Sequence, residues 1–177
     1  MITQRRIALA MLMAMVLLSN HLVFSQAGSA QNTNATSTQQ SQGNTDQDID
    51  LLRKDVRSQK KQMIAANMNL TDAEAVKFWP VYDQYTAELV KINDKKYATI
   101  KDYAQNYDTL TDDQAMNLTK QVLEVDESVA QLRQKYIPIF AKVLPGKKTA
   151  LFFQLDRRLV MLIDLQLSAA IPLVQQQ

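Results

Sequence analysis

A single glycine, Gly146, stands between Asp48 and the C-terminus of this 177-residue chain. Tight β-hairpins and phosphate-binding loops both need glycine where a side chain would clash or where the backbone turns left-handed. From Asp48 onward we therefore expect neither kind of structure. The apolar residues of this part recur at intervals of three and four, which is the spacing of an amphipathic helix. The sequence predicts an all-α fold.

Two capping boxes mark the starts of two long helices. In such a box, a threonine side chain bonds a backbone amide of the first turn, and the glutamate or glutamine three residues later bonds the threonine amide. The motif residues of the two boxes are Leu70, Thr71, Glu74, Leu110, Thr111 and Gln114. We expect a helix to follow each threonine, and the short turn near Thr109 makes the two helices antiparallel.

Two further helices complete the expected fold. One runs from Asp48 or Asp50 to about Asn67, and the other, over about 148–169, is densely apolar. The helix that follows Thr111, the third along the chain, has a heptad seam of the kind found in coiled coils. Its members are Ala115, Leu118, Val122, Val125, Val129, Leu132, Tyr136, Ile139 and Val143. The predicted architecture is a long antiparallel helical hairpin with an N-terminal helix and an apolar C-terminal helix.

Each long helix contains a proline between large apolar residues. Pro80 and Pro138 lie equally far along the chain from Thr109, so a closed hairpin would place them side by side. A proline inside a helix removes a hydrogen bond and bends the helix. We expect the hairpin to be bent near Pro80 and Pro138. The alternative is two unrelated kinks that packing tolerates.

Apolar residues outside the hairpin seam need a partner of their own. They form one row on the third helix, at Met116, Leu123, Ala130 and Ile137, and another on the second, at Trp79, Val90 and Tyr97. The first and fourth helices could cover these rows, or the rows could form a dimer interface or a surface that binds other polypeptides. The candidate polypeptide-binding residues are Trp79, Tyr97, Met116, Leu123 and Ile137.

The N-terminus has the pattern of a secretory signal. Arg5 and Arg6 precede an apolar stretch over 7–18, and the small residues Ser25 and Ala27 follow at the spacing of a cleavage site. We expect a signal peptide over 1–27, an uncleaved membrane anchor being the alternative. A polar, low-complexity tract over 28–47 is predicted to be a disordered tether, and residues 48–177 to form the helical domain.

Charge and composition exclude several functions. Without residues 1–27 the chain has 18 basic and 18 acidic residues, so it is not expected to bind nucleic acid. His21, within the predicted signal, is the only histidine, and there is no cysteine. The usual general base, thiol nucleophile and transition-metal ligands are therefore missing from the helical part. We expect no enzyme activity, no metal site and no cofactor.

The two caps carry a family resemblance. The segment LTDDQ at 110–114 fits an LTxxQ pattern, and LTDAE at 70–74 departs from it only at Glu74. With the predicted signal and the absence of cysteine, the chain resembles a divergent member of the Spy/CpxP family of exported helical proteins over about residues 48–145. The resemblance implies a periplasmic protein that forms a cradle-shaped dimer of hairpins. Metal-responsive relatives use histidines that this chain lacks, so metal binding does not carry over.

These expectations combine into one predicted function. The resemblance implies an ATP-independent periplasmic chaperone or a modulator of an envelope-stress sensor, and we expect a non-enzymatic protein that binds unfolded or partner polypeptides. It would form a homodimer as the family does, and would contact the membrane only through an uncleaved signal. The alternative is a closed helical module, structural or regulatory, that docks to one envelope partner.

Overall fold

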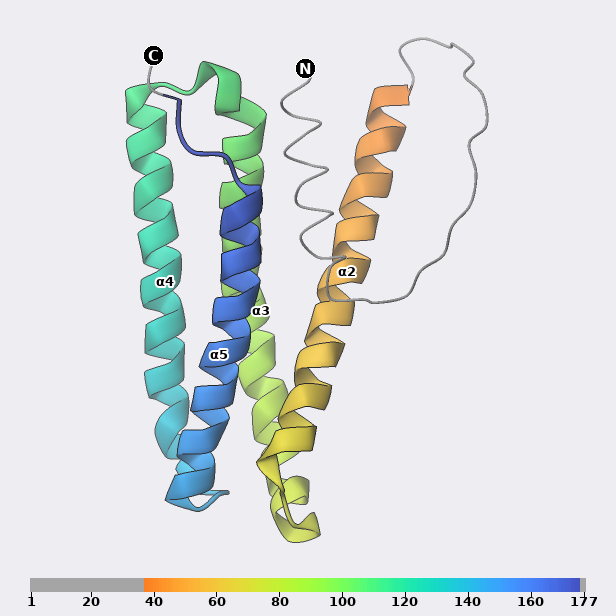
Figure 1. Ribbon diagram of the computed structural model, residues 1–177, viewed down its shortest axis with the longest axis vertical. Helices are drawn as coiled ribbons and strands as arrows, with labels where there is room; N and C mark the ends of the chain where they lie inside the picture. The colour runs from red at the N-terminus through yellow and green to blue at the C-terminus, as the bar shows by residue number, and fades with distance from the viewer. Residues whose placement is uncertain (1–36, 176–177) are drawn as a thin grey trace.

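The computed structural model describes residues 37–175, and the side chains of residues 47–175. Over this range the chain forms helices α2 (Ser37–Met68), α3 (Asp72–Asn106), α4 (Asp112–Ala141) and α5 (Gly146–Ala170), with a short 3-10 helix, η1 (Tyr107–Thr109), between α3 and α4 (Figure 1). No strand occurs among residues 37–175. The prediction of an all-α fold is confirmed.

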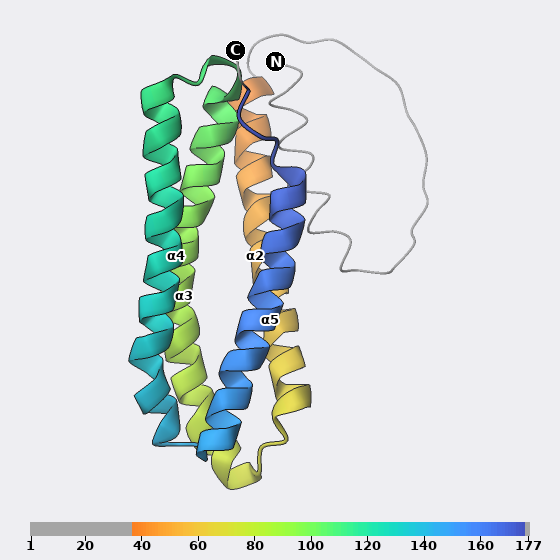
Figure 2. The same ribbon diagram turned by 60° about the vertical axis from the view of Figure 1, so that its left-hand side comes forward.

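The four helices form an up-down-up-down bundle. The long hairpin of α3 and α4 packs against α5 and α2, and short loops make each helix antiparallel to the next (Figures 1 and 2). Polar or aromatic contacts join each neighbouring pair. They are Lys61–Asp83 for α2 and α3, Lys135–Glu88 for α3 and α4, Phe140–Phe152 for α4 and α5, and Lys60–Asp156 for α2 and α5.

Most of the buried side chains lie toward the end of the bundle that holds the α2–α3 and α4–α5 loops. Six rings pack there in edge-to-face and tilted contacts, and we call this set the aromatic core. Its members are Phe78, Tyr82, Tyr85, Tyr136, Phe140 and Phe152. The closest ring pair, Phe140 and Phe152, has centroids 4.3 Å apart. Each such pair adds about 0.5–1.5 kcal/mol to what its area burial contributes, so this end is the stable half of the bundle.

The two prolines lie at the same level of the hairpin. Phe78, two residues before Pro80, packs on Phe140, two residues after Pro138, with ring centroids 5.5 Å apart. Both helices continue through their prolines. The contact agrees with the predicted pairing of Pro80 and Pro138, whereas the predicted bend of the hairpin stays a prediction.

The first helix is longer than the sequence indicated. The prediction placed its start at Asp48 or Asp50, but α2 begins at Ser37. Residues 37–47, predicted as part of the tether over 28–47, are therefore helical. Extension of an existing helix adds one hydrogen bond per residue, and the glutamines of this tract favour helix, so the helix grows backward from its packed part. The predicted signal over 1–27 and the rest of the tether lie outside the described residues.

Over residues 37–175, no helix is both long enough and apolar enough to cross a membrane.

Candidate functional site: an interhelical cavity and an exposed apolar row

Both predicted capping boxes are present. At the start of α3 the Glu74 amide donates to Thr71 Oγ1 (3.3 Å) and the Thr71 amide donates to Glu74 Oε2 (2.8 Å). Thr111 and Gln114 repeat this arrangement at the start of α4, with distances of 3.3 and 2.9 Å. Leu70, the residue before the first box, packs against the buried hydrophobic core. The two boxes explain why the helices begin where they do.

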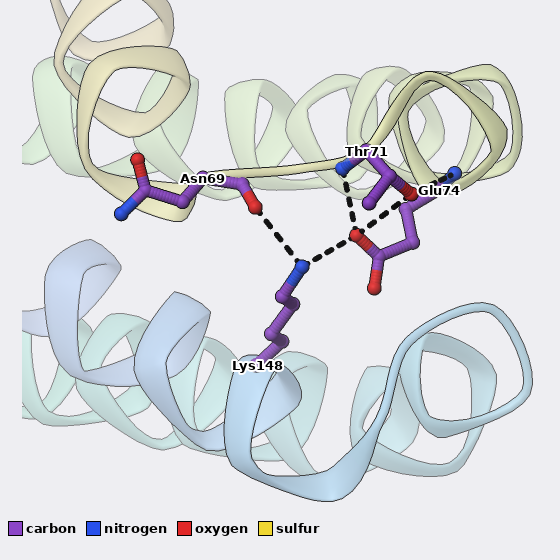
Figure 3. Close-up of polar contacts among 4 residues, drawn as sticks. All are labelled: Asn69, Thr71, Glu74 and Lys148. Atoms are coloured by element: carbon purple, nitrogen blue, oxygen red, sulfur yellow. Dashed lines mark hydrogen bonds and ion pairs between the residues drawn. The ribbon is translucent and has the colours of Figure 1, made fainter.

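The first box has a partner that the second lacks. Lys148, in the first turn of α5, donates to Glu74 Oε2 and to the carbonyl oxygen of Asn69, the latter at 3.0 Å (Figure 3). Asn69 has a φ of 45°, the left-handed conformation that commonly ends a helix. The Lys148 ammonium holds the pKa of Glu74 below its usual value, aided by the backbone hydrogen bond from Thr71. One lysine thus joins the α2–α3 loop to the start of α5.

A buried carboxylate connects all four helices just beyond the aromatic core. Asp156 of α5 is fully buried and accepts hydrogen bonds from Lys60 Nζ of α2 at 2.6 Å and from Arg133 Nε of α4 at 3.1 Å. The hydroxyl of Tyr85, on α3, donates to the same carboxylate at 2.9 Å. We call these four side chains the Asp156 network. Burial, with Asp156 close by, raises the pKa of Tyr85.

Asp156 was not predicted from the sequence, in which the last helix is densely apolar and its inward face was expected to carry no charge. The available signal was its position four residues after Phe152 and three before Leu159, which places it on the apolar stripe. A buried carboxylate needs ionic partners, and these come from three other helices, whose packing the sequence does not reveal.

A cavity of about 340 Å³ lies on the side of the Asp156 network away from the aromatic core. All four helices line it. Its apolar walls are Ile49, Leu52, Val56, Leu89, Val90, Tyr97, Ile100, Val125, Val129, Val160, Ile163 and Leu167. Its polar lining consists of Arg53, Arg57, Asn93, Lys96, Asp126, Arg133 and Asp164. The size and mainly apolar lining are those of a small-molecule site, which typically spans about 300–1,000 Å³.

Most of the charges around the cavity are already paired. Arg53 forms an ion pair with Asp94, and Lys96 forms one with Asp164 of α5. The Lys96 side chain is 29% exposed. The Arg57 guanidinium has no hydrogen bond or ion pair to any other described residue.

Arg133 is only partly satisfied. Its Nε bonds Asp156, but its Nη2 is buried and has no hydrogen-bond partner in the described part of the chain. A buried donor without a partner costs about 1–3 kcal/mol. Arg133 lines the cavity through other atoms, since Nη2 itself has almost no accessible surface.

Two of the predicted polypeptide-binding residues lie beneath α2. Trp79 is half-buried against Phe78, with ring centroids 4.9 Å apart, and the Lys61 ammonium lies 5.2 Å from its ring. Tyr97 is half-buried in the cavity wall, and the Arg53 guanidinium lies 5.5 Å from its ring centroid. The apolar shoulder of α3 is therefore covered by the N-terminal helix, which is one of the arrangements the sequence left open.

The other three candidates form an exposed line on α4, which we call the α4 row. Met116, Leu123 and Ile137 have 60%, 63% and 48% of their surface exposed. Helices α2 and α5 do not cover this row, so the first of the three predicted alternatives is wrong for α4. The row does not meet Trp79 and Tyr97 on a common surface, and its role stays a prediction.

Neither metal chemistry nor known relatives assign a role to this site. Among the described residues, no group of three or more histidine, cysteine, aspartate or glutamate side chains could hold a metal ion. Comparison of the chain with protein-family models, curated proteins and solved structures gives no significant match.

Proposed function

We propose that this chain is an exported, non-enzymatic protein that binds other polypeptides through the α4 row. The exposure of three large apolar side chains at heptad spacing carries this proposal. The opposite face of the same helix is packed, since Leu118, Val125 and Leu132 are buried. An apolar row left exposed on an otherwise packed helix is typical of an interaction surface.

Binding to this row would be weak and reversible. Burial of apolar surface stabilises a complex by about 25 cal/mol per Å², and three side chains offer a narrow contact. Lys120 and Glu127 lie three residues before and four after Leu123, so charges of both signs flank the row. Mixed charge at the edge favours exchange of partners over tight binding to one of them.

The two capping boxes support the same proposal. LTDDQ at 110–114 and the related LTDAE at 70–74 resemble the pattern of the Spy/CpxP family, whose members act as ATP-independent periplasmic chaperones or as modulators of envelope-stress sensors. We infer a periplasmic location and a chaperone-like or sensor-modulating role from that resemblance.

The second candidate is a closed module that docks to one envelope partner. It is favoured by the position of α2 and α5, which cover one face of the hairpin and place Trp79 and Tyr97 beneath α2. Only the α4 row is then left for a partner, and a single narrow row suits one defined partner better than many unfolded ones.

An aggregation assay without ATP separates the two candidates. We expect the chain, at equimolar ratio, to suppress aggregation of a denatured model protein. The variant Met116→Ser/Leu123→Ser/Ile137→Ser should lose most of this activity. A matched control, Val76→Ser/Met161→Ser/Leu165→Ser, changes three equally exposed apolar residues elsewhere and should keep it. Absence of suppression by the parent chain would contradict a general polypeptide-binding role and favour the closed module.

A further inference from the structure

We propose that the interhelical cavity is a binding site for a single-chain amphipathic carboxylate, such as a fatty acid, with its alkyl chain among the apolar walls and its carboxylate at Arg57. This site is separate from the α4 row, and the proposal does not depend on the proposed function.

The walls select an apolar chain of limited size. About 340 Å³ of space is bounded by twelve apolar residues drawn from all four helices. This volume is near the lower end of the range for small-molecule sites. It therefore suits one alkyl chain and not the two chains of a phospholipid.

The charged groups select an anion. Four cationic residues line the cavity against two anionic ones, and Arg57 has no ionic partner among the described residues. Of the two anionic residues, Asp164 is neutralised by Lys96, and Asp126 is exposed at the edge. Arg133 is paired with Asp156, so the Arg57 guanidinium is the positive group left to receive a ligand among the described residues of the lining.

Guanidinium groups suit a carboxylate in particular. Their planar N–H donors match the two carboxylate oxygens and form charge-assisted hydrogen bonds. Arg57 lies three residues before Lys60 on α2, so the head group would lie about one helical turn from the Asp156 network.

One wall is positioned to admit such a ligand. Figure 1 shows the N-terminal part of α2 diverging from the other three helices. Ile49, Leu52 and Val56, on this part of α2, form one side of the cavity. Displacement of α2 would open that side, whereas the aromatic core at the other end would stay packed.

Calorimetric titration of the full chain with dodecanoate tests the proposal. We expect one molecule to bind per chain, and dodecyltrimethylammonium, which has the same tail and the opposite charge, to bind at least tenfold more weakly. Arg57→Gln should weaken dodecanoate binding about tenfold, the loss of one charge-assisted contact. The matched control Arg158→Gln, on the exposed face of α5, should leave it unchanged. Equal binding of the two amphiphiles, or no effect of Arg57→Gln, would overturn the proposal.

The location is tested by filling the cavity. Val160→Phe and Leu167→Phe each place a ring in the space that the alkyl chain would occupy. We expect both variants to bind dodecanoate at least tenfold more weakly while their urea unfolding stays cooperative. If Val160→Phe or Leu167→Phe folds cooperatively and binds dodecanoate as tightly as the parent, the ligand binds elsewhere and the proposal is overturned. A parent chain that binds no dodecanoate would also overturn it.

Discussion

The hydroxyl of Tyr85 donates a 2.9 Å hydrogen bond to the carboxylate of Asp156, and both side chains are fully buried. Tyr85→Phe would remove this donor and keep the ring in the aromatic core. We expect the free energy of unfolding, measured in urea, to fall by about 1–3 kcal/mol, because a buried acceptor loses a partner. Tyr103→Phe, which removes a hydroxyl bonded to the Pro172 carbonyl, should cost less. Equal losses in the two variants would contradict a special role for the Asp156 network.

The Asp156 network should also show strong non-additivity. Asp156→Ala leaves the buried parts of Lys60 and Arg133 without a counter-charge, and breaking a buried ion pair in this way costs about 3–5 kcal/mol. The triple variant Lys60→Met/Arg133→Met/Asp156→Leu removes the charges together with their desolvation penalty. We expect its stability in urea to be much closer to that of the parent. A triple variant less stable than Asp156→Ala would refute this account.

The two capping boxes allow one variant in each box to be compared with a matched variant in the other. Gln114→Ala removes only the hydrogen bonds that the Thr111 amide and hydroxyl donate to Gln114 Oε1, and we expect a loss of about 1 kcal/mol. Glu74→Ala removes the equivalent bonds from Thr71 and also the contact with Lys148 of α5. The free energy of unfolding, measured by heat or urea, should therefore fall further in Glu74→Ala than in Gln114→Ala. Lys148→Met should account for the difference, and an equal effect of Glu74→Ala and Gln114→Ala would show that Lys148 adds nothing.

The stability contributed by Glu74 should depend on pH. Its pKa in the folded chain lies below the usual value of 4.5, chiefly because of the hydrogen bond from Lys148. A lowered pKa stabilises the fold above the unfolded value, and the contribution is lost as the pH falls through the folded value. We expect the parent to exceed Glu74→Gln in unfolding free energy by a constant amount near neutral pH, and the difference to shrink below pH 4.5. A difference that persists undiminished in strong acid would contradict this prediction.

Helix starts could be predicted where the signal is local. Thr71 and Thr111 were identified as caps from five-residue motifs, and the structure has both capping boxes at those residues. Such a motif bonds to its own first turn, so tertiary packing does not alter it. The start of α2, by contrast, was predicted more than ten residues too late.

Burial was harder to predict than helix position. The heptad seam of α4 correctly marked Leu118, Val125 and Leu132 as buried, yet Val122 in the same seam is 47% exposed. Periodicity identifies the face of a helix that turns inward, but it does not tell how many helices meet that face at each level. The cavity and the Asp156 network depend on four helices at once, so no single segment of the sequence indicates them.

The aromatic core fills one end of the bundle, and the cavity occupies part of the other. Local unfolding starts where the fewest apolar contacts hold the chain, so backbone amides near the cavity should exchange with solvent faster than those near Phe140 and Phe152. Molecules in solution could then reach the cavity through local unfolding of this end, without unfolding of the whole bundle. A ligand would enter and leave at a rate set by this local unfolding, while the aromatic core keeps the other end of the bundle folded.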